Sequence, residues 1–427
     1  MDNIVSRLLN GHPAAASLKG IYSICSAHPW VLGAAMQQAQ VDGTPLLVES
    51  TSNQVDQYGG YTGIKPADFV KFVQLIADRV GFSPDHLILG GDHLGPNAWR
   101  SLPAEEAMLR AEALIDAYVS AGFTKIHLDT SMSCGGDPER LSDSVVAERA
   151  SRLCAIAEAA AVRRGGQIMP VYVIGTEVPV PGGASEALSR VDVTTCEAAL
   201  DTVAVHRRAW RTRNLDQAWG RVIALVVQPG VEFDHTRVID YQPELATGLC
   251  QMLTQLPGMV FEAHSTDYQR PESLHALVRD GFAILKVGPG VTFALREVLY
   301  ALADIEAEVL SANQRSDLRA TVEAVMLRKP ANWERYYHGD ERETRLLRTY
   351  SYSDRVRYYW ADPEVDGAVQ KLIGNLSKIA IPENLLSQYL PMQYWEMRRG
   401  VIDGSPISIV QSKIREVIRE YASACRE

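Results

Sequence analysis

The sequence lacks any apolar run long enough to cross a membrane. Its start, Met1-Asp2-Asn3-Ile4-Val5, has neither the basic first segment nor the apolar centre of a secretory signal. These absences argue against a membrane protein and a secreted one, and we expect the chain to be cytoplasmic.

A surplus of positive charge is also missing. The chain holds 42 Lys and Arg against 52 Asp and Glu, which gives a formal net charge of -10. Nucleic acids and anionic membranes attract basic surfaces, so we expect neither as a partner. A small metabolite or another protein is the expected partner.

Closely spaced cysteine pairs are absent as well. The six cysteines are scattered and form no C-x-x-C pair or zinc-knuckle spacing. They are typical of reduced thiols in a cytosolic protein. The chain also lacks a G-x-G-x-x-G after its first predicted strand and a P-loop, which argues against a dinucleotide-binding sheet and a kinase.

What the sequence does contain is a regular alternation of short apolar runs and helical patterns. With 427 residues and 46% hydrophobic residues, the chain is long enough for one large α/β domain plus an extension. The expected strands are 20–26, 45–50, 87–96, 125–129, 169–174, 223–227, 259–263 and 283–287. Eight such units within residues 1–292 predict a (β/α)8 TIM barrel, and a doubly wound open sheet is the alternative.

Residues 293–427 show helical patterns only and are predicted to form a helical extension packed on the barrel. An aromatic and basic segment within it includes Tyr358, Tyr359 and Trp360. Tyr, Trp and Arg are common in interface hot spots, but the same residues are equally typical of a packing layer against the barrel.

Polar side chains end several of the predicted strands. In a barrel these ends meet at one face, where the chemistry of such folds is found. His93, Glu177 and His264 offer imidazole and carboxylate ligands for a divalent cation, Zn, Mn or Ni. Asp92 is placed beside them as an acid or base, and Asp129 and Glu177 are further catalytic candidates.

Other strand-end residues are candidates for contact with substrate. They are Ser26, Glu49, Ser50, Gln228, Ser265, Thr266, Lys286, Gly288 and Gly290. The glycines follow the eighth strand, where TIM barrels commonly hold a phosphate on backbone amides. Two residues within strands are weaker candidates, because alternation would turn Glu262 outward and His127 is also typical of a core histidine.

These segments resemble a known family. GIYSICSAHPWVL, LLVESTSNQVDQYGGYTG, LILGGDHLGPN, KIHLDTSMSC, VIGTEVPVPGGA, LVVQPGVEFDH, FEAHSTDYQ, AILKVGPG and SYSDRVRYYW are similar to the Z subunit of D-tagatose-1,6-bisphosphate aldolase. The resemblance implies a non-catalytic subunit that stabilises a class II, zinc-dependent aldolase partner in galactitol or N-acetylgalactosamine catabolism, which degrades tagatose 6-phosphate. The family has also carried the label tagatose-6-phosphate kinase, which no motif here supports.

The Z subunit is itself similar to class II aldolases. The resemblance implies that Asp92 is their catalytic aspartate and that His93 and His264 are two of their zinc ligands, with Glu177 in their glutamate loop. Two departures stand out. Pro229 replaces the second zinc histidine, and residues 265–267, Ser-Thr-Asp, replace the glycines of the phosphate cradle.

Two functions remain open. The first is an accessory subunit of the aldolase complex, because one aldolase ligand and the cradle are missing. The second is a metal-dependent ketose epimerase that acts alone on C4 of a sugar of the fructose or tagatose type. This is favoured because an acid and two imidazoles remain at the open end of the barrel. The ligand is then a sugar or sugar phosphate, and a homo-oligomer is compatible with either function.

Overall fold

A computed structural model of the chain describes residues 18–176, 184 and 191–426. Eight parallel strands close into a barrel in the order β1-β10-β9-β6-β5-β4-β3-β2, which confirms the predicted TIM barrel. The strands are β1 (Ile21–Ile24), β2 (Leu46–Thr51), β3 (Leu87–Leu94), β4 (Lys125–Leu128), β5 (Val171–Ile174), β6 (Val222–Val226), β9 (Val260–Ala263) and β10 (Ile284–Val287). A small antiparallel pair, β7 (Glu232–Phe233) and β8 (Val238–Ile239), follows β6 and was not expected.

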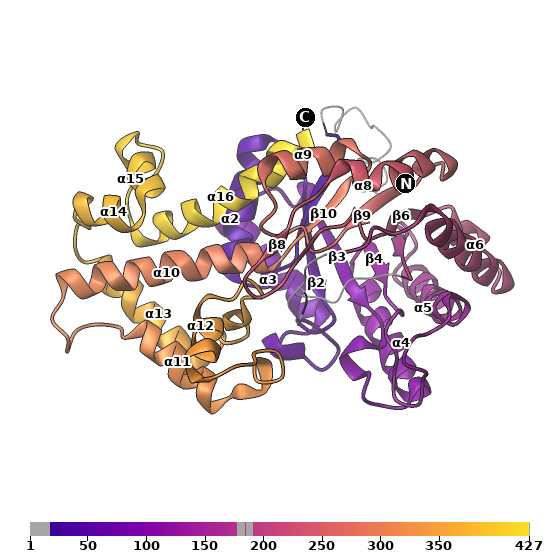
Figure 1. The fold of residues 1–427 in the computed structure, drawn as a ribbon, viewed down its shortest axis with the longest axis horizontal. Coiled ribbons are helices and arrows are strands. Elements are labelled where there is room, and N and C mark those ends of the chain that lie inside the picture. The colour runs from indigo at the N-terminus through magenta and orange to yellow at the C-terminus, as the bar shows by residue number, and fades with distance from the viewer. Residues whose placement is uncertain (1–17, 177–183, 185–190, 427) are drawn as a thin grey trace.

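Helices surround this barrel (Figure 1). They are α2 (Pro29–Asp42), α3 (Pro66–Val80), α4 (Ala104–Ala121), α5 (Asp143–Arg163), α6 (Cys196–Thr212), α7 (Asp216–Trp219), α8 (Pro243–Met252), α9 (Pro271–Arg279) and α10 (Pro289–Val309). Helix α3 shows why such segments are helical. Proline occupies its first turn, apolar side chains recur on the face that includes Phe69 and Val73, and Gly81 ends it with a φ of 73°.

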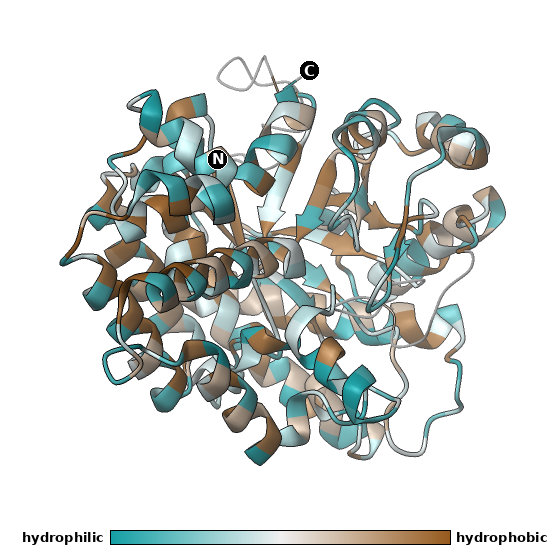
Figure 2. Ribbon diagram, turned by 60° about the vertical axis from the view of Figure 1, so that its left-hand side comes forward, coloured by the Kyte–Doolittle hydropathy of each residue, from teal (hydrophilic) through white to brown (hydrophobic). Residues whose placement is uncertain are grey.

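The strands are buried on both faces. Figure 2 shows largely hydrophobic strands at the centre of the molecule, while the surrounding helices alternate between hydrophobic and hydrophilic turns. This is the pattern of a parallel sheet that is covered by helices. Inside the barrel, an apolar layer is formed by residues that include Ile21, Leu47, Ile88, Val171, Ala224 and Ile284.

Above that apolar layer the barrel interior becomes ionic. Lys125 Nζ lies 2.7 Å from Glu49 Oε1 and 2.7 Å from Glu262 Oε2, and all three side chains are fully buried. Lys286 pairs with Glu49 as well. Gly90 leaves the room for this layer, because a Cβ there would lie 2.5 Å from Glu49 Oε1. The expectation that Glu262 turns outward is wrong: its side chain points into this layer.

The C-terminal segment is helical, and its described residues beyond α10 contain no strand. Its helices are α11 (Leu318–Arg328), α12 (Glu341–Tyr350), α13 (Pro363–Leu376), α14 (Glu383–Tyr389), α15 (Pro391–Arg398) and α16 (Pro406–Arg426). The predicted boundary between residues 292 and 293 falls inside α10. In Figure 1 these helices gather on one side of the barrel, beside α2 and α10.

The last helix is part of the barrel wall. Helix α16 packs against α2, α9 and α10 and reaches β1. Its residue Cys425 accepts backbone hydrogen bonds from Lys19 and Gly20 at the entry to β1, and Tyr421 Oη donates to the carbonyl of Thr266 at 2.7 Å.

All six cysteines are free thiols. None of the helices in the described part of the chain is both long and apolar enough to span a bilayer.

We therefore expect the barrel to depend on α16. Ile418 is fully buried in this helix, and its replacement by alanine should lower the free energy of unfolding by about 2–5 kcal/mol, because it leaves a cavity. Glu420→Ala, at an exposed position of the same helix, is the control and should change it by less than about 0.5 kcal/mol. Urea titration followed by circular dichroism measures both, and equal stability of the two variants would contradict the role of α16.

Candidate metal centre

Three histidines meet at the carboxyl ends of the strands. His93 lies in β3, His127 in β4, and His264 directly after β9. Their ring centroids are 4.8 Å apart for His93 and His264 and 5.1 Å apart for the two other pairs. Together with Asp92 they offer four buried ligand atoms that lie within 4.8 Å of one another.

Each histidine has a carboxylate beside one of its ring nitrogens. His93 Nδ1 lies 2.8 Å from Asp129 Oδ2, and His264 Nε2 lies 2.9 Å from Glu262 Oε1. His127 Nδ1 lies 3.1 Å from Asp92 Oδ1 and accepts a hydrogen bond from the backbone N–H of His93 at 3.2 Å. In His93 and His264, a carboxylate that takes the proton of one ring nitrogen leaves the other nitrogen with its lone pair free, which is the usual setting of metal-binding histidines.

The Nε2 atom of His127 is buried and has no hydrogen-bond partner among the described residues. An unsatisfied buried polar atom costs about 1–3 kcal/mol, and a cation would remove that cost. Three imidazoles and a carboxylate suit Zn²⁺ or a similar borderline cation. The residues present therefore fit a divalent metal.

The balance of buried charge supports the same conclusion. Four carboxylates are packed together, those of Glu49, Asp92, Asp129 and Glu262. Among the described residues, the ammonium groups of Lys125 and Lys286 lie between them. A buried excess of negative charge is unfavourable unless cations balance it. A bound divalent cation would contribute to that balance.

The pKa values of the cluster shift in different directions from residue to residue. Although burial lowers the pKa of His93, the charges of Asp92 and Asp129 raise it above its ordinary value. Burial lowers the pKa of His264 to about 4, so this imidazole is neutral and able to act as a ligand at pH 7. Although burial raises the pKa of Asp92, His93 and Lys286 hold it well below its ordinary value. Asp92 is thus an ionised carboxylate.

Lys286 is held as a cation. Its Nζ lies 2.9 Å from Asp92 Oδ1, and it also pairs with Glu49 and Glu262. Although burial lowers its pKa, these carboxylates raise it well above the ordinary value. A protonated amine cannot attack a carbonyl, so the geometry does not favour Schiff-base chemistry at this lysine.

The backbone is strained on both sides of the cluster. His93 has a φ of 48° and Ser265 has a φ of 54°, in the left-handed region that side chains other than glycine seldom adopt. Such strain is kept where the surroundings demand it and is common at functional sites. Here the strained backbone directs His93 and the turn after β9 toward the histidine cluster.

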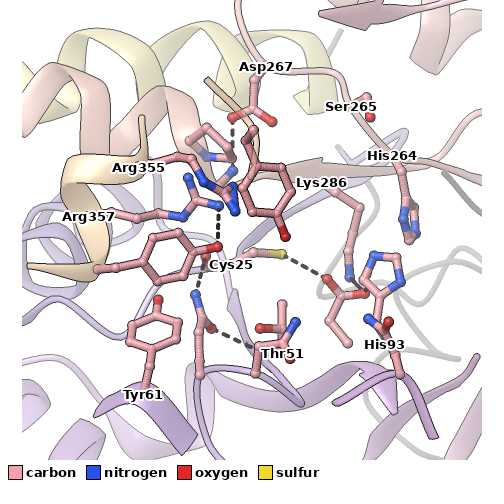
Figure 3. A pocket seen from close by; sticks show the side chains of 18 of the residues that line it. Cys25, Thr51, Tyr61, His93, His264, Ser265, Asp267, Lys286, Arg355 and Arg357 are labelled. Carbon is pink, nitrogen blue, oxygen red and sulfur yellow. Dashed lines mark hydrogen bonds and ion pairs between the residues drawn. The ribbon is translucent and has the colours of Figure 1, made fainter. Parts of the chain in front are cut away.

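The cluster opens into a cavity with a volume of about 800 Å³. This volume lies in the range of small-molecule sites, about 300–1,000 Å³. Several predicted site residues line it: Asp92, His93, His264, Ser265, Lys286 and Gly288. Figure 3 shows His93, His264 and Lys286 together on one side of the cavity.

Other predicted residues lie outside the lining of this cavity, and of these Gln228 is half-buried while the rest are buried. As described above, Asp129 bonds to His93, and Glu49 pairs with Lys125 and Lys286. Ser50 bonds to Tyr118 Oη at 3.0 Å, and Thr266 Oγ1 donates to the carbonyl of Lys286 at 2.7 Å. Ser26 accepts from the backbone of His28, and Gln228 accepts from the backbone amides of Gly230 and Val231. Contact of these residues with a substrate stays a prediction, as do the ligand and catalytic roles of Glu177, which lies outside the described residues.

The predicted phosphate cradle is filled by the chain itself. The amide groups of Gly288 and Gly290 both donate to Asp267 Oδ1, at 2.9 and 2.7 Å. These amides form the N-terminal end of α10, whose dipole favours a negative charge there. Asp267 is one of the residues that replace the aldolase glycines, so the same change that removes the cradle also supplies the group that fills it.

One functional candidate was ranked low from the sequence, and a second group was not predicted. His127 was set aside as a core histidine, although Lys125, His127 and Asp129 alternate along one strand and so had to share a face. The second group is basic and lines the cavity, namely Arg100, Arg335, Arg355 and Arg357. Arg355 and Arg357 belong to the aromatic and basic segment noted in the sequence, but no local pattern indicated that they would line the cavity of the barrel.

These features define a class of protein: a (β/α)8 barrel with a buried histidine and carboxylate cluster where its strands end. The chain belongs to the family described as D-tagatose-1,6-bisphosphate aldolase subunit GatZ/KbaZ-like, whose sequence profile matches residues 6–426. It is 51% identical to a probable tagatose 6-phosphate kinase from Sinorhizobium meliloti 1021, over 95% of this chain and 100% of that one, with a TM-score of 0.88.

A more distant likeness is to the fructuronate-tagaturonate epimerase UxaE from Cohnella laeviribosi. The identity is 11%, the match covers 98% of this chain and 85% of that one, and the TM-score is 0.51. At this identity the likeness shows the fold alone.

We expect the purified chain to bind about one divalent cation, which elemental analysis after dialysis measures. His127→Ala and His264→Ala should each lose most of this metal, because each removes a nitrogen ligand. His206→Ala is the matched control, since His206 is a fully buried histidine of α6 outside the cluster. Full retention of metal by the two cluster variants would contradict the site.

Asp129 is expected to position His93. Asp129→Asn keeps the size of the side chain but weakens its hold on His93 Nδ1, so the affinity for the metal should fall about 10- to 100-fold. Competition with a chromogenic chelator measures this affinity. Asp137→Asn is the control, because Asp137 pairs with Arg149 away from the cluster, and an equal loss of affinity in this variant would refute the positioning role.

Proposed function

We propose that the chain is a divalent-metal-dependent ketose epimerase that inverts C4 of a sugar of the fructose or tagatose type. The observation that supports this most is the ionised Asp92 carboxylate, which lies beside three imidazoles at the inner end of the cavity. Asp92 Oδ1 is taken by Lys286 and His127, whereas Oδ2 has only a weak contact with the Cys25 thiol at 3.7 Å. One oxygen of this base therefore remains available for a substrate proton.

The reaction that fits this arrangement is reversible aldol cleavage. Asp92 takes the proton of the C4 hydroxyl, the C3–C4 bond breaks, and its electron pair stays on the fragment that carries the ketone. A bound divalent cation would stabilise the negative charge that this fragment acquires. After the aldehyde fragment turns its other face, the C3–C4 bond reforms and Asp92 returns the proton to the C4 oxygen. No oxidant or other reactant is needed.

The remaining side chains of the cluster hold Asp92 and the histidines in place. Lys286 keeps Asp92 ionised and oriented, and it lines the cavity. Asp129 and Glu262 hold the rings of His93 and His264. The buried position of Asp92, 3% exposed, keeps bulk water from the proton that it carries.

A second candidate function is that of an accessory subunit. It is favoured by the description of the family as an aldolase subunit. In this case the chain associates with a catalytic class II aldolase chain and raises its stability or activity. Both functions are compatible with one fold, and they differ in whether Asp92 is required.

The epimerase activity is tested on the purified, metal-loaded chain. We expect interconversion of fructose and tagatose, or of their 6-phosphates, followed by carbon-13 NMR. Asp92→Asn should reduce the rate about 100-fold or more, because it removes the base. Asp85→Asn, in an exposed turn before β3, is the control and should keep full activity.

The accessory function is tested with the same variants. Co-expression with a class II aldolase chain should raise the yield or activity of that partner, and Asp92→Asn should do so equally well. Absence of turnover on all four sugars with zinc, manganese, nickel and cobalt would reject the epimerase, and absence of association would reject the subunit.

A further inference from the structure

The cavity lining is rich in basic residues although the whole chain is acidic. Among the described lining residues five are basic, Arg100, Arg335, Arg355, Arg357 and Lys286, and two are acidic, Asp92 and Asp267. The positive charge of Lys286 is balanced by the carboxylates around it. The other basic residues are arginines, and none of them belongs to the metal cluster.

The two deeper arginines have no carboxylate partner. Among the described residues, no Asp or Glu lies within ion-pair distance of Arg355 or Arg357. Arg355, 7% exposed, donates to the backbone carbonyl of Asn332 and stacks over the ring of Tyr336, 3.3 Å from its centroid. Arg357 donates to the carbonyl of Asp354 at 3.1 Å and to Tyr358 Oη at 2.9 Å. Two neighbouring guanidinium groups without a counter-charge are unfavourable unless an anion joins them.

The segment that carries them is fixed to the barrel. The carboxylate that could have neutralised them, Asp354, is used elsewhere: Arg296 Nε donates to its Oδ1 at 2.8 Å and Thr292 Oγ1 donates to its Oδ2 at 2.7 Å. These bonds tie the segment to the first turns of α10. The arginine pair is therefore pre-organised, which lowers the entropic cost of binding a ligand.

The alternative place for an anion is closed. Asp267 already accepts both amides at the N-terminus of α10, so a phosphate there would have to displace a carboxylate and lie beside its charge. Figure 3 shows Arg355, Arg357 and Tyr61 on one side of the cavity, with His93 and His264 on the other and Cys25 between them. An anion held by the arginines is thus separated from the metal cluster by the width of the cavity.

We propose that Arg355 and Arg357 form the anion-binding subsite of the cavity. They hold an oxyanion, a phosphate ester or a carboxylate, at the end of the ketose that is remote from the carbon inverted at Asp92. Asp267 keeps the ordinary amide cradle of the barrel closed, so that the ligand is bound in one direction. This subsite deepens the proposed function and rests on it for the ketose.

Binding to the metal-loaded full chain, measured by calorimetry, tests the subsite without requiring turnover. The probes are D-tagatose, D-tagatose 6-phosphate and D-tagaturonate. We expect at least one of the two anionic probes to bind at least about tenfold more tightly than D-tagatose, and Arg355→Met and Arg357→Met to remove this preference while leaving the affinity for D-tagatose unchanged. The tighter of the two probes identifies the anion as phosphate or carboxylate.

Arg342→Met is the matched control. Arg342 is an exposed arginine of α12 in the same C-terminal segment and does not line the cavity, so its loss changes the net charge equally and should leave all affinities unchanged. The metal content of every variant should equal that of the unmodified chain. Failure of the epimerase assay leaves these binding results intact.

Two outcomes would overturn the subsite. In the first, both arginine variants retain the preference for the anionic probe. In the second, the unmodified chain shows no preference, but Asp267→Ala, which frees the two amides, binds the anionic probe more tightly. The second outcome would assign the anion to the N-terminus of α10.

Discussion

The architecture of the site depends on bonds between buried carboxylates and the basic groups that they face. Glu49 and Glu262 hold Lys125 and Lys286 in the barrel interior, and from this layer Glu262 reaches His264 and Lys286 reaches Asp92. A buried charge is tolerated only when it is paired. The ionic layer therefore fixes the rotamers of the residues above it, and the surplus of carboxylate charge is what makes this end of the barrel suited to a cation.

The C-terminal segment completes the barrel in two ways. Helix α16 covers the strands at the join between β1 and the last part of the barrel, and the segment around Arg355 forms one wall of the cavity. The aromatic and basic residues there were predicted to serve either an interface or a packing layer. Tyr359 and Trp360 are buried and belong to the core, which supports packing, while the arginines of the same segment face the cavity. The segment is thus integral to both the fold and the site.

The sequence allowed the barrel and part of the site to be predicted, for a physical reason. Strands buried on both faces leave continuous apolar runs, and polar residues such as Asp92 and His93 stand out where these runs end. His127 did not stand out, because a single histidine within a strand is also compatible with a core position. Arg355 and Arg357 could not be placed, since more than two hundred residues separate them from the β3 strand that ends in His93, and only the folded chain brings them to one cavity. The hydrogen bonds from the amides at the start of α10 to Asp267 likewise arise from tertiary contact, and no local sequence pattern predicts them.

We infer that the cluster of His93, His127, His264 and Asp92 is a metal centre rather than a buried polar core. An anomalous difference map, measured from crystals of the purified chain above and below the absorption edge of the metal it retains, tests this most directly. We expect one strong peak bounded by the three imidazoles, with the Asp92 carboxylate beside it. A map without a peak there, from crystals grown with zinc, manganese or nickel and with the three rings ordered as described, would contradict it.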